Sequence, residues 1–244
     1  MKRSKSKGIA ETIRTVFFAV IIAMTVRTFG YEPFNIPSGS MIPTLLIGDY
    51  LFVSKFSYGY SKHSLPFSLP LISDRIFFTE PERGDVAVFK LPYDNATDYI
   101  KRIIGLPGDT VQVTSGILKI NGTRVDRVQI EDFVIEGQWG TFHRTPQFEE
   151  ILPNGKKHAI LEESDTDWLD NTPQFLIPEG HYFVMGNNRD RSKDSRVMSS
   201  VGFIPKDNLV GRAEFLFFSI NGSVWEFWNW PKSIRFQRIF KSID

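Results

Sequence analysis

Short apolar runs alternate with turn residues along most of this chain, but the first thirty residues follow another pattern. Residues 15–26 are uncharged and mostly apolar, and Arg14 and Arg27 flank them. A helix of that length spans only about 18 Å, less than the roughly 30 Å hydrocarbon core of a bilayer. The flanking arginines can extend their side chains to the interface, however, and the stretch from Ile9 to Tyr31 is long enough for a tilted span. We therefore expect a transmembrane helix here.

Two other interpretations of this segment are weaker. A cleaved signal peptide needs a small-x-small site after its apolar run, and residues 26–30 contain none. A helix in a soluble core normally has a polar face, and residues 15–26 show no clear one. The basic residues that precede the segment are Lys2, Arg3, Lys5 and Lys7. By the positive-inside rule they predict an uncleaved, single-pass signal anchor with a cytoplasmic N-terminus.

Beyond the anchor, the pattern predicts a mainly β protein. Short apolar runs are bounded by turn signals such as Gly48-Asp49, Ser115-Gly116 and Asn121-Gly122, which is typical of strands and hairpins. We expect a strand–turn–strand unit over 34–56, and further strands at 86–89, 99–104, 111–113, 118–120, 181–185 and 209–220. Strands at such short intervals favour a folded-over, barrel-like sheet.

Two polar stretches interrupt this pattern. Residues 57–82 are rich in Ser, Pro and aromatic residues and are expected to form a surface loop, whereas residues 126–175 are polar, poorly periodic and expected to form an insertion. The chain then divides into a cytoplasmic tail and anchor (1–31), the first part of the main β domain (32–110), an inserted, cap-like and β-rich domain (111–180) and the second part of the main β domain (181–244).

The composition excludes several kinds of chemistry. With 41% hydrophobic and 23% charged residues, the 244-residue chain is of globular type. Its net charge of +1 gives no reason to expect nucleic-acid binding. Cysteine is absent, which excludes a thiol nucleophile, a cysteine zinc site and a disulfide. Since no metal-ligand spacing is present either, we expect neither a metal nor a cofactor.

Ser40 is the candidate nucleophile. Gly39 allows the backbone to approach a substrate closely, and Pro43 stiffens the chain behind the serine. Most serines in such a turn are only turn residues, so an activating base is required, and either an imidazole or a neutral amine can serve. The histidines lack an acidic partner at a recognisable spacing: His63, His143, His158 and His181.

Lys101 is the candidate base. A lysine with a pKa near 10.4 is protonated at neutral pH, but desolvation can lower that pKa by several units. The residues around it are apolar: Tyr99, Ile100, Ile103 and Ile104. Most strand lysines are exposed, however, and the neighbouring Arg102 leaves open whether Lys101 points inward.

These motifs resemble those of type I signal peptidases, the serine–lysine endopeptidases that remove signal peptides from exported bacterial proteins. The resemblance is carried, in the family's order, by residues 31–34, 37–45, 48–49, 83–86, 98–109 and 186–196. It implies a single-pass protein of the bacterial inner membrane with a periplasmic catalytic domain. Signal peptides of preproteins and membrane lipid would be its partners.

The resemblance also implies roles for individual residues. Ser40 would be the nucleophile, Lys101 the general base, and the Ser38 hydroxyl would form an oxyanion hole with the Ser40 N–H. Ser192 would orient the lysine. A structural pair nearby would be Asp194 and Arg196. Two shallow pockets would be lined by Phe34, Ile36, Met41, Leu45, Tyr99 and Ile100. Because alternate residues of an extended peptide face the same way, these pockets would select small residues one and three positions before the cut.

The chain departs from the family pattern in its last motif. Asn187 replaces an aspartate and Arg191 replaces an asparagine. Residues 197–201 stand where the family commonly has an aromatic pair. These changes put the local loop packing in question but leave the expected reaction unchanged.

Three other functions compete with that of a signal peptidase. A self-cleaving repressor-type protein would carry a DNA-binding or partner module, which the sequence does not show. A conjugation-pilus maturation protease shares the serine and lysine motifs and is harder to exclude. A membrane-anchored β domain that binds peptides without cutting them would lack Ser40 or Lys101, and both are present.

Aromatic residues gather near the C-terminus. They are Trp225, Phe227, Trp228 and Trp230, with Lys232 and Arg235 after them. Tryptophan is enriched at membrane interfaces, and basic residues add attraction to anionic lipid. We expect this cluster to contact the membrane; the alternative is that its rings close the β core.

Overall fold

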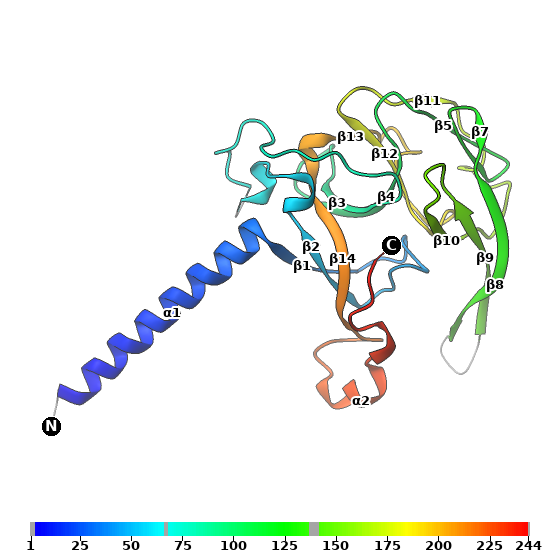
Figure 1. Cartoon of the computed structure of the whole chain (residues 1–244). Helices are drawn as coiled ribbons and strands as arrows, with labels where there is room; N and C mark the ends of the chain where they lie inside the picture. Colours follow the sequence, from blue (N-terminus) through cyan, green and yellow to red (C-terminus); the bar gives the residue numbers. More distant parts are fainter. Residues whose placement is uncertain (1–2, 66–67, 137–141, 244) are drawn as a thin grey trace.

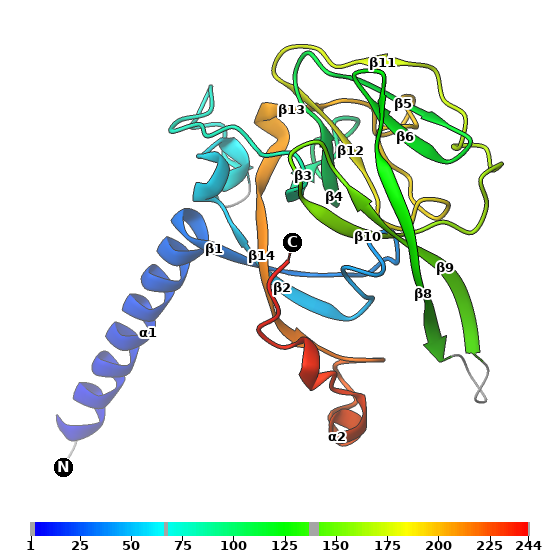
Figure 2. The same cartoon turned by 45° about the vertical axis from the view of Figure 1, so that its right-hand side comes forward.

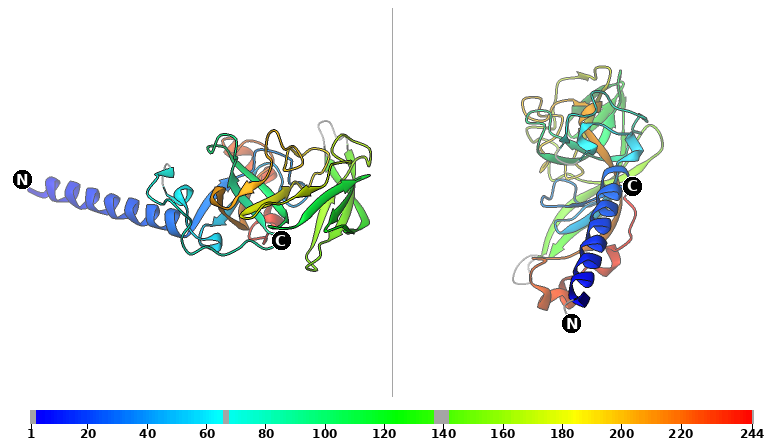
Figure 3. Two further views of the ribbon diagram at one scale, coloured as in Figure 1. Left: turned by 90° about the horizontal axis from the view of Figure 1, so that it is seen from above. Right: turned by 90° about the vertical axis from the view of Figure 1, so that its left-hand side faces the viewer.

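A long helix projects from a β-rich body in the computed structural model, which describes residues 3–65, 68–136 and 142–243 (Figure 1). Helix α1 is Arg3–Phe29, and its segment Gly8–Phe29 is long and apolar enough to cross a membrane. Seen from above, the helix extends away from the body (Figure 3), and the body buries none of its apolar window. The expected apolar helix is confirmed, and it fits a single-pass membrane protein.

The body is mainly β, as the pattern predicts. The strands of the described part are β1 Tyr31–Asn35, β2 Asp49–Ser54, β3 Val86–Lys90, β4 Asp98–Gly105, β5 Thr110–Thr114, β6 Ile117–Ile120, β7 Thr123–Arg124, β8 Asp126–Glu136, β9 Phe142–Ile151, β10 Lys157–Leu161, β11 Phe175–Leu176, β12 His181–Met185, β13 Ile204–Pro205 and β14 Leu209–Ser219. The turn residues Ser115-Gly116 and Asn121-Gly122 join β5 to β6 and β6 to β7, where the sequence predicts hairpins.

The largest sheet has seven strands in the order β1-β2-β14-β3-β4-β12-β13. Strand β14 pairs with β2 on one side and β3 on the other, and its pairing with β2 shifts register between Ala213 and Phe215 and again between Leu216 and Phe218. Such bulges bend a strand and increase its twist. The sheet therefore curves around a core that includes Leu51, Val53 and Val88.

Two smaller sheets lie together at the end of the body away from α1 (Figure 2). One has the order β10-β9-β8 and the other β11-β5-β6-β7. Residues 110–176 supply all their strands and none of the seven-stranded sheet. The two parts nevertheless share a core, because Val111 and Leu118 pack in one cluster with Ile104 and Phe183. The division into a main domain and an insertion stays an interpretation.

Several described residues of the segment 57–82 are buried, although others are exposed. Tyr58, His63 and Arg75 are buried. The Arg75 guanidinium donates to the carbonyl oxygens of Gly59 and Leu209, which ties this segment to β14. Phe29 at the end of α1 contacts the ring of Tyr60 in the same segment. The expectation of a surface loop is therefore wrong for its buried residues, which join the helix end to the sheet.

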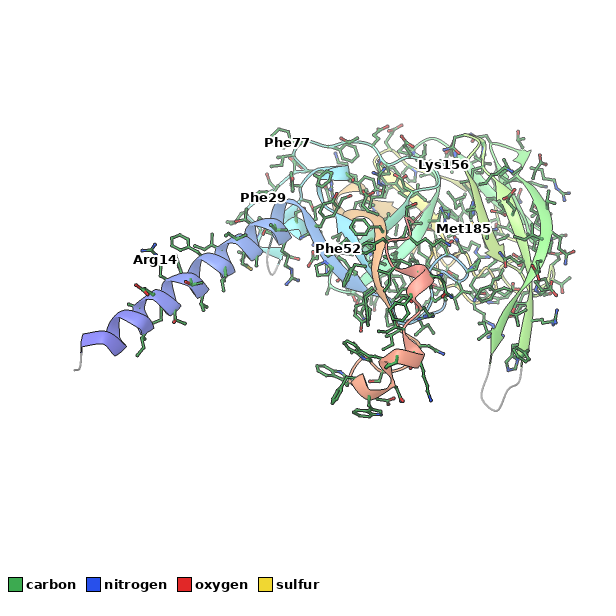
Figure 4. All side chains as sticks on the ribbon, turned by 60° about the horizontal axis from the view of Figure 1, so that its bottom comes forward. Arg14, Phe29, Phe52, Phe77, Lys156 and Met185 are labelled. Atoms are coloured by element: carbon green, nitrogen blue, oxygen red, sulfur yellow. The ribbon has the colours of Figure 1, made fainter. Side chains whose placement is uncertain are left out.

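The C-terminal segment protrudes from the body and contains a one-turn helix, α2 (Trp230–Ser233) (Figure 4). Trp225 is 83% and Trp228 65% exposed, and Phe227 is exposed as well. Trp230 alone of the four packs inward, with its ring 5.6 Å from that of Phe218. Three of the four rings therefore do not close the β core.

Candidate active site

Ser40 lies in the loop that connects β1 to β2. Met41 and Leu45 follow it, and a hydrogen bond of 2.9 Å from Leu45 N to Met41 O closes a turn between them. Both side chains are fully buried in the main core. Ser40 itself is only 8% exposed, so a loop that the core fixes holds the hydroxyl in place.

Lys101 reaches Ser40 from the opposite side of the site. It lies on β4, paired with Ala87 of β3, and is 4% exposed. Its Nζ donates to Ser40 Oγ at 2.8 Å and to Ile100 O at 3.0 Å. The fold thus brings together the candidate nucleophile and base, which are 61 positions apart.

Both Lys101 and its neighbour Arg102 are buried. The Arg102 guanidinium points to the other face of the strand, where it donates to Gly84 O at 2.6 Å. Simple alternation could not decide which side chain points inward, because both faces of this end of β4 are covered.

Burial changes the acidity of Lys101. Desolvation lowers the pKa of its ammonium group from 10.5 to about 8, while the Asp194 carboxylate acts in the opposite direction. A lysine with that pKa is partly neutral near neutral pH, and only the neutral amine can accept a proton. The aromatic ring of Tyr99 lies 5.3 Å from Nζ and covers the amine on one side.

Ser38 stands next to the nucleophile. Its Oγ lies 3.4 Å from Ser40 Oγ. Among the described residues, none accepts a hydrogen bond from the Ser40 N–H. A hydroxyl and a free backbone N–H are the kinds of donor that can stabilise an oxyanion.

The loop of residues 186–196 packs directly against the loop between β1 and β2 that carries Ser40, which we call the nucleophile loop. Asn188 N donates to Ser40 O at 3.1 Å, and Asn188 Nδ2 donates to Gly39 O at 3.2 Å. Gly186 has no room for a side chain, since a Cβ there would lie 2.6 Å from Ser40 O. Gly186 and Asn188 both belong to the last family motif, residues 186–196, but no local sequence pattern predicts that they contact Gly39 and Ser40.

Ser192 is buried beside the same glycine, and its Oγ would lie 2.1 Å from a Cβ placed on Gly186. By geometry it makes no hydrogen bond with a described residue, although it is near enough to the Asp194 carboxyl to help lower its pKa. The structure thus places Ser192 in the site without a direct bond to Lys101.

Asp194 and Arg196 form a buried ion pair, with Arg196 Nε 2.9 Å from Asp194 Oδ1. Asp194 also accepts from Gly186 N at 3.0 Å, and Arg196 donates to Arg189 O at 2.6 Å. Burial raises the pKa of the Asp194 carboxyl, but Arg196 and these hydrogen bonds hold it below its usual value. The pair therefore closes the loop that carries Ser192.

Asn187, which replaces the aspartate of the family pattern, is hydrogen-bonded on both sides of its amide group. Its Oδ1 accepts from Arg102 Nε at 3.2 Å and its Nδ2 donates to Thr44 Oγ1 at 2.6 Å. An amide can both accept and donate, so this side chain links β4 to the nucleophile loop.

A groove of about 530 Å³ opens beside Ser40 and Lys101. Of the residues expected to line substrate pockets, four lie on its wall: Phe34, Ile36, Tyr99 and Ile100. Arg191 and Lys193 lie at the same groove. Met41 and Leu45 do not line it, in contrast to the expectation, because both are fully buried beneath it in the core.

No histidine takes the place of Lys101 within the described part of the chain. The side-chain partners of Ser40 Oγ there are Lys101 and Ser38. The buried His158 lies 3.4 Å from Glu150 in an ion-pair cluster, and His181 contacts the carbonyl of Glu179.

The family whose description reads "Signal peptidase, peptidase S26" matches residues 9–218. The chain belongs to this family. Signal peptidase I of Rickettsia typhi is 38% identical over 257 aligned positions, which cover 98% of this chain and 95% of that protein. Signal peptidase I of Rickettsia canadensis is 38% identical over 261, covering 99% and 96%. A crystal structure of a signal peptidase I from Enterococcus faecalis V583 is 28% identical, covers 55% of this chain and 97% of that chain, and has a TM-score of 0.33.

Membership of the signal peptidase family confirms the resemblance inferred from the motifs. The matched stretch of the S26 family includes the end of α1, the nucleophile loop, β4 and the loop of residues 186–196. The residues around Ser40 and Lys101 therefore all lie in the part of the chain that defines the family.

Proposed function

We propose that this protein is a membrane-bound serine endopeptidase that removes N-terminal signal peptides from exported preproteins. The observation that carries the proposal is the 2.8 Å hydrogen bond between Lys101 Nζ and Ser40 Oγ, in a site where both residues are buried. Membership of the signal peptidase family supports the substrate class.

The acylation step uses Lys101 as general base. Its neutral amine takes the hydroxyl proton of Ser40 while Oγ attacks the carbonyl carbon of the scissile bond. The oxyanion that forms accepts hydrogen bonds from Ser38 Oγ and Ser40 N–H. Loss of one such donor costs about 3–4 kcal/mol of transition-state stabilisation in a well-studied case.

The lysine then acts as general acid and again as base. When the C–N bond breaks, the Lys101 ammonium gives its proton to the leaving amine, which becomes the N-terminus of the mature protein. Water attacks the ester on Ser40 and loses a proton to Lys101. The bond between the acyl carbon and Ser40 Oγ then breaks, Lys101 returns the proton to Oγ, and the signal peptide leaves with a new carboxyl terminus. The buried Ser192 hydroxyl, which lacks a partner among the described residues, would orient the lysine through these steps.

We expect cleavage to require small residues one and three positions before the cut. Bulky Phe34, Ile36 and Ile100 narrow the groove. A preprotein whose signal peptide ends in Ala-x-Ala should be cut, and Phe at the position before the cut should slow cleavage by about 100-fold or more. Phe at the middle position is the matched control, because that side chain faces away. Purified protein in detergent, with the cut mapped by mass spectrometry, tests this; equal rates on all three substrates would contradict the pocket assignment.

We also propose that the catalytic domain faces the periplasm, close to the bilayer. The basic residues that precede the apolar segment Gly8–Phe29 favour a cytoplasmic N-terminus. Ser40 follows the end of α1 at Phe29 by so few residues that it cannot lie more than roughly 40 Å from the helix end. Protease added to spheroplasts should digest the region after Tyr31 and spare the tail. Protection of the large domain would refute this orientation.

The C-terminal aromatic cluster is expected to bind lipid even without α1. Trp225 and Trp228 are exposed, whereas Trp230 packs on Phe218. In a protein that begins at Tyr31, Trp225→Ser with Trp228→Ser should weaken binding to anionic vesicles and leave the melting temperature unchanged. Trp230→Ser is the matched control and should lower the melting temperature. Unchanged vesicle binding after the double substitution would contradict the lipid contact.

A further inference from the structure

Three carboxylates outside the proposed active site point into one small space. They belong to Glu162, Asp170 and Asp190, and one oxygen of each lies within 4.8 Å of the other two. Glu162 is 4% and Asp170 0% exposed, while Asp190 is half-buried. Burying carboxylates together is costly unless a positive charge or a proton compensates them.

Each carboxylate leaves an oxygen without a partner. Asp170 Oδ2 accepts from Asp167 N at 2.6 Å, and Asp190 Oδ2 accepts from the backbone N–H groups of residues 163–164. The other oxygens, Asp170 Oδ1 and Asp190 Oδ1, are buried and make no hydrogen bond with a described residue, as is also true of Glu162 Oε2. Backbone amides thus fix the two aspartates and leave an oxygen of each side chain available to a ligand.

The nearby arginines are engaged elsewhere. Arg189 donates to Glu150 with both terminal nitrogens, and Arg127 pairs with Asp165 at 2.6 Å. Among the described residues, none forms a salt bridge with the three carboxylates. Burial, opposed in part by Arg189 and reinforced by the two aspartates, raises the pKa of the Glu162 carboxyl to about 8.

We propose that Glu162, Asp170 and Asp190 bind a calcium ion. Carboxylate oxygens are the ligands of hard divalent cations, and Ca²⁺ holds them at about 2.3–2.6 Å. Since two oxygens on opposite sides of such an ion are about 4.6–5.2 Å apart, three oxygens within 4.8 Å of one another lie close enough together to contact the same ion. Mg²⁺ usually keeps several waters and binds through one or two carboxylates, so three carboxylates that converge in a buried space favour Ca²⁺. Bidentate carboxylates and water can complete a calcium shell.

The ion would clamp the insertion onto the loop that holds the nucleophile. Leu161, which precedes Glu162, donates from N to Asn187 O at 2.8 Å. Asp190 lies two positions after Asn188, whose N–H donates to Ser40 O. Because Glu162 and Asp170 come from one segment and Asp190 from the other, a shared ion would stabilise the folded arrangement of both.

Calorimetry on the full chain in detergent, after treatment with EDTA and dialysis, tests the proposal. Titration with CaCl₂ should show one ion bound per chain, and MgCl₂ should bind at least about tenfold more weakly. Calcium at 100 times its dissociation constant should raise the melting temperature by about 5–10 °C.

Two isosteric variants locate the site. Asp170→Asn and Glu162→Gln should each abolish calcium binding and the thermal shift. Asp167→Asn is the matched control, since it removes the same charge from an exposed neighbour and should bind calcium like the unmodified protein. No calcium binding and no thermal shift in the unmodified protein would overturn the proposal and leave a shared proton among the carboxylates. Undiminished binding by both variants would also overturn it.

Discussion

Replacing Lys101 with methionine is expected to abolish cleavage and, at the same time, to raise the melting temperature. The side chain is buried, and its pKa falls from 10.5 to about 8. A shift of that size corresponds to about 3 kcal/mol spent on keeping the ammonium in the folded protein. Methionine fills a similar volume without a charge. At about 2–4 °C per kcal/mol for a chain of this size, the melting temperature should rise by several degrees.

The size of this stabilisation depends on pH. Because the pKa of Lys101 is lower in the folded than in the unfolded chain, the stability cost is fully present below pH 8. It fades as the pH rises from 8 toward 10.5, where the unfolded lysine also loses its proton. The melting temperatures of Lys101→Met and the unmodified protein should therefore converge near pH 10.

The cleavage rates of the Lys101 and Ser40 variants test the proposed mechanism. Cleavage of a preprotein should fall by a factor of about 10⁴ or more in Lys101→Met, since the proposed general base is removed. Ser40→Ala should be equally inactive but should not gain stability, because it keeps the buried lysine. In the unmodified protein kcat/KM should rise with pH up to about 8 and then level off. Retained cleavage by Lys101→Met would contradict the serine–lysine mechanism, whereas substitution of all four histidines should leave substantial activity.

The anchor and most strands of the main sheet are accessible to sequence reasoning because their apolar patterns are local. Residues 15–26 lie within α1, and the expected strand at 99–104 lies within β4. Both ends of these elements are marked by turn residues or by charge. The nature of each element follows from neighbours only a few positions away.

The strands within residues 126–175 are harder to predict from sequence, because exposed side chains do not alternate with buried ones along the longest of them. Val128, Ile130, Val134 and Ile135 of β8 are exposed hydrophobic residues. Exposed and half-buried positions do not alternate along β8 or along β9, so both lack the period-two pattern of a strand with one buried face. The sequence of residues 126–175 is poorly periodic for this reason, although these residues contain the three-stranded sheet.

The site itself shows where local patterns stop. The pair of Ser40 and Lys101 could be inferred from family motifs, but Asn188 holds the nucleophile loop from 149 positions away. No spacing rule connects two such segments. Met41 shows that adjacency in the sequence can also mislead. An apolar residue next to a nucleophile can line the substrate groove or lie in the core beneath it, and the sequence pattern is the same in both cases. Only the three-dimensional packing separates these cases.

The final prediction concerns Gly186, whose replacement by alanine should reduce kcat/KM by about 100-fold, mainly through kcat. An added Cβ would lie 2.1 Å from Ser192 Oγ and 2.6 Å from Ser40 O. The serine side chain can rotate away, but the carbonyl belongs to the backbone of the nucleophile. The loop must therefore move, and a displacement of about 1 Å is enough to cause a loss of that size.

Gly105→Ala is the control that separates this local effect from general overpacking. Its Cβ would lie 2.2 Å from Ile177 Cδ1, in the core shared with the insertion and without contact to the nucleophile loop. Both substitutions should lower the melting temperature, because each crowds a filled site. Only Gly186→Ala should lower kcat when the two variants are compared at a temperature where both are folded. An unchanged kcat in Gly186→Ala would contradict the close approach of Gly186 to the Ser40 carbonyl. The position of Ser40 would then depend on the hydrogen bonds from Asn188 alone.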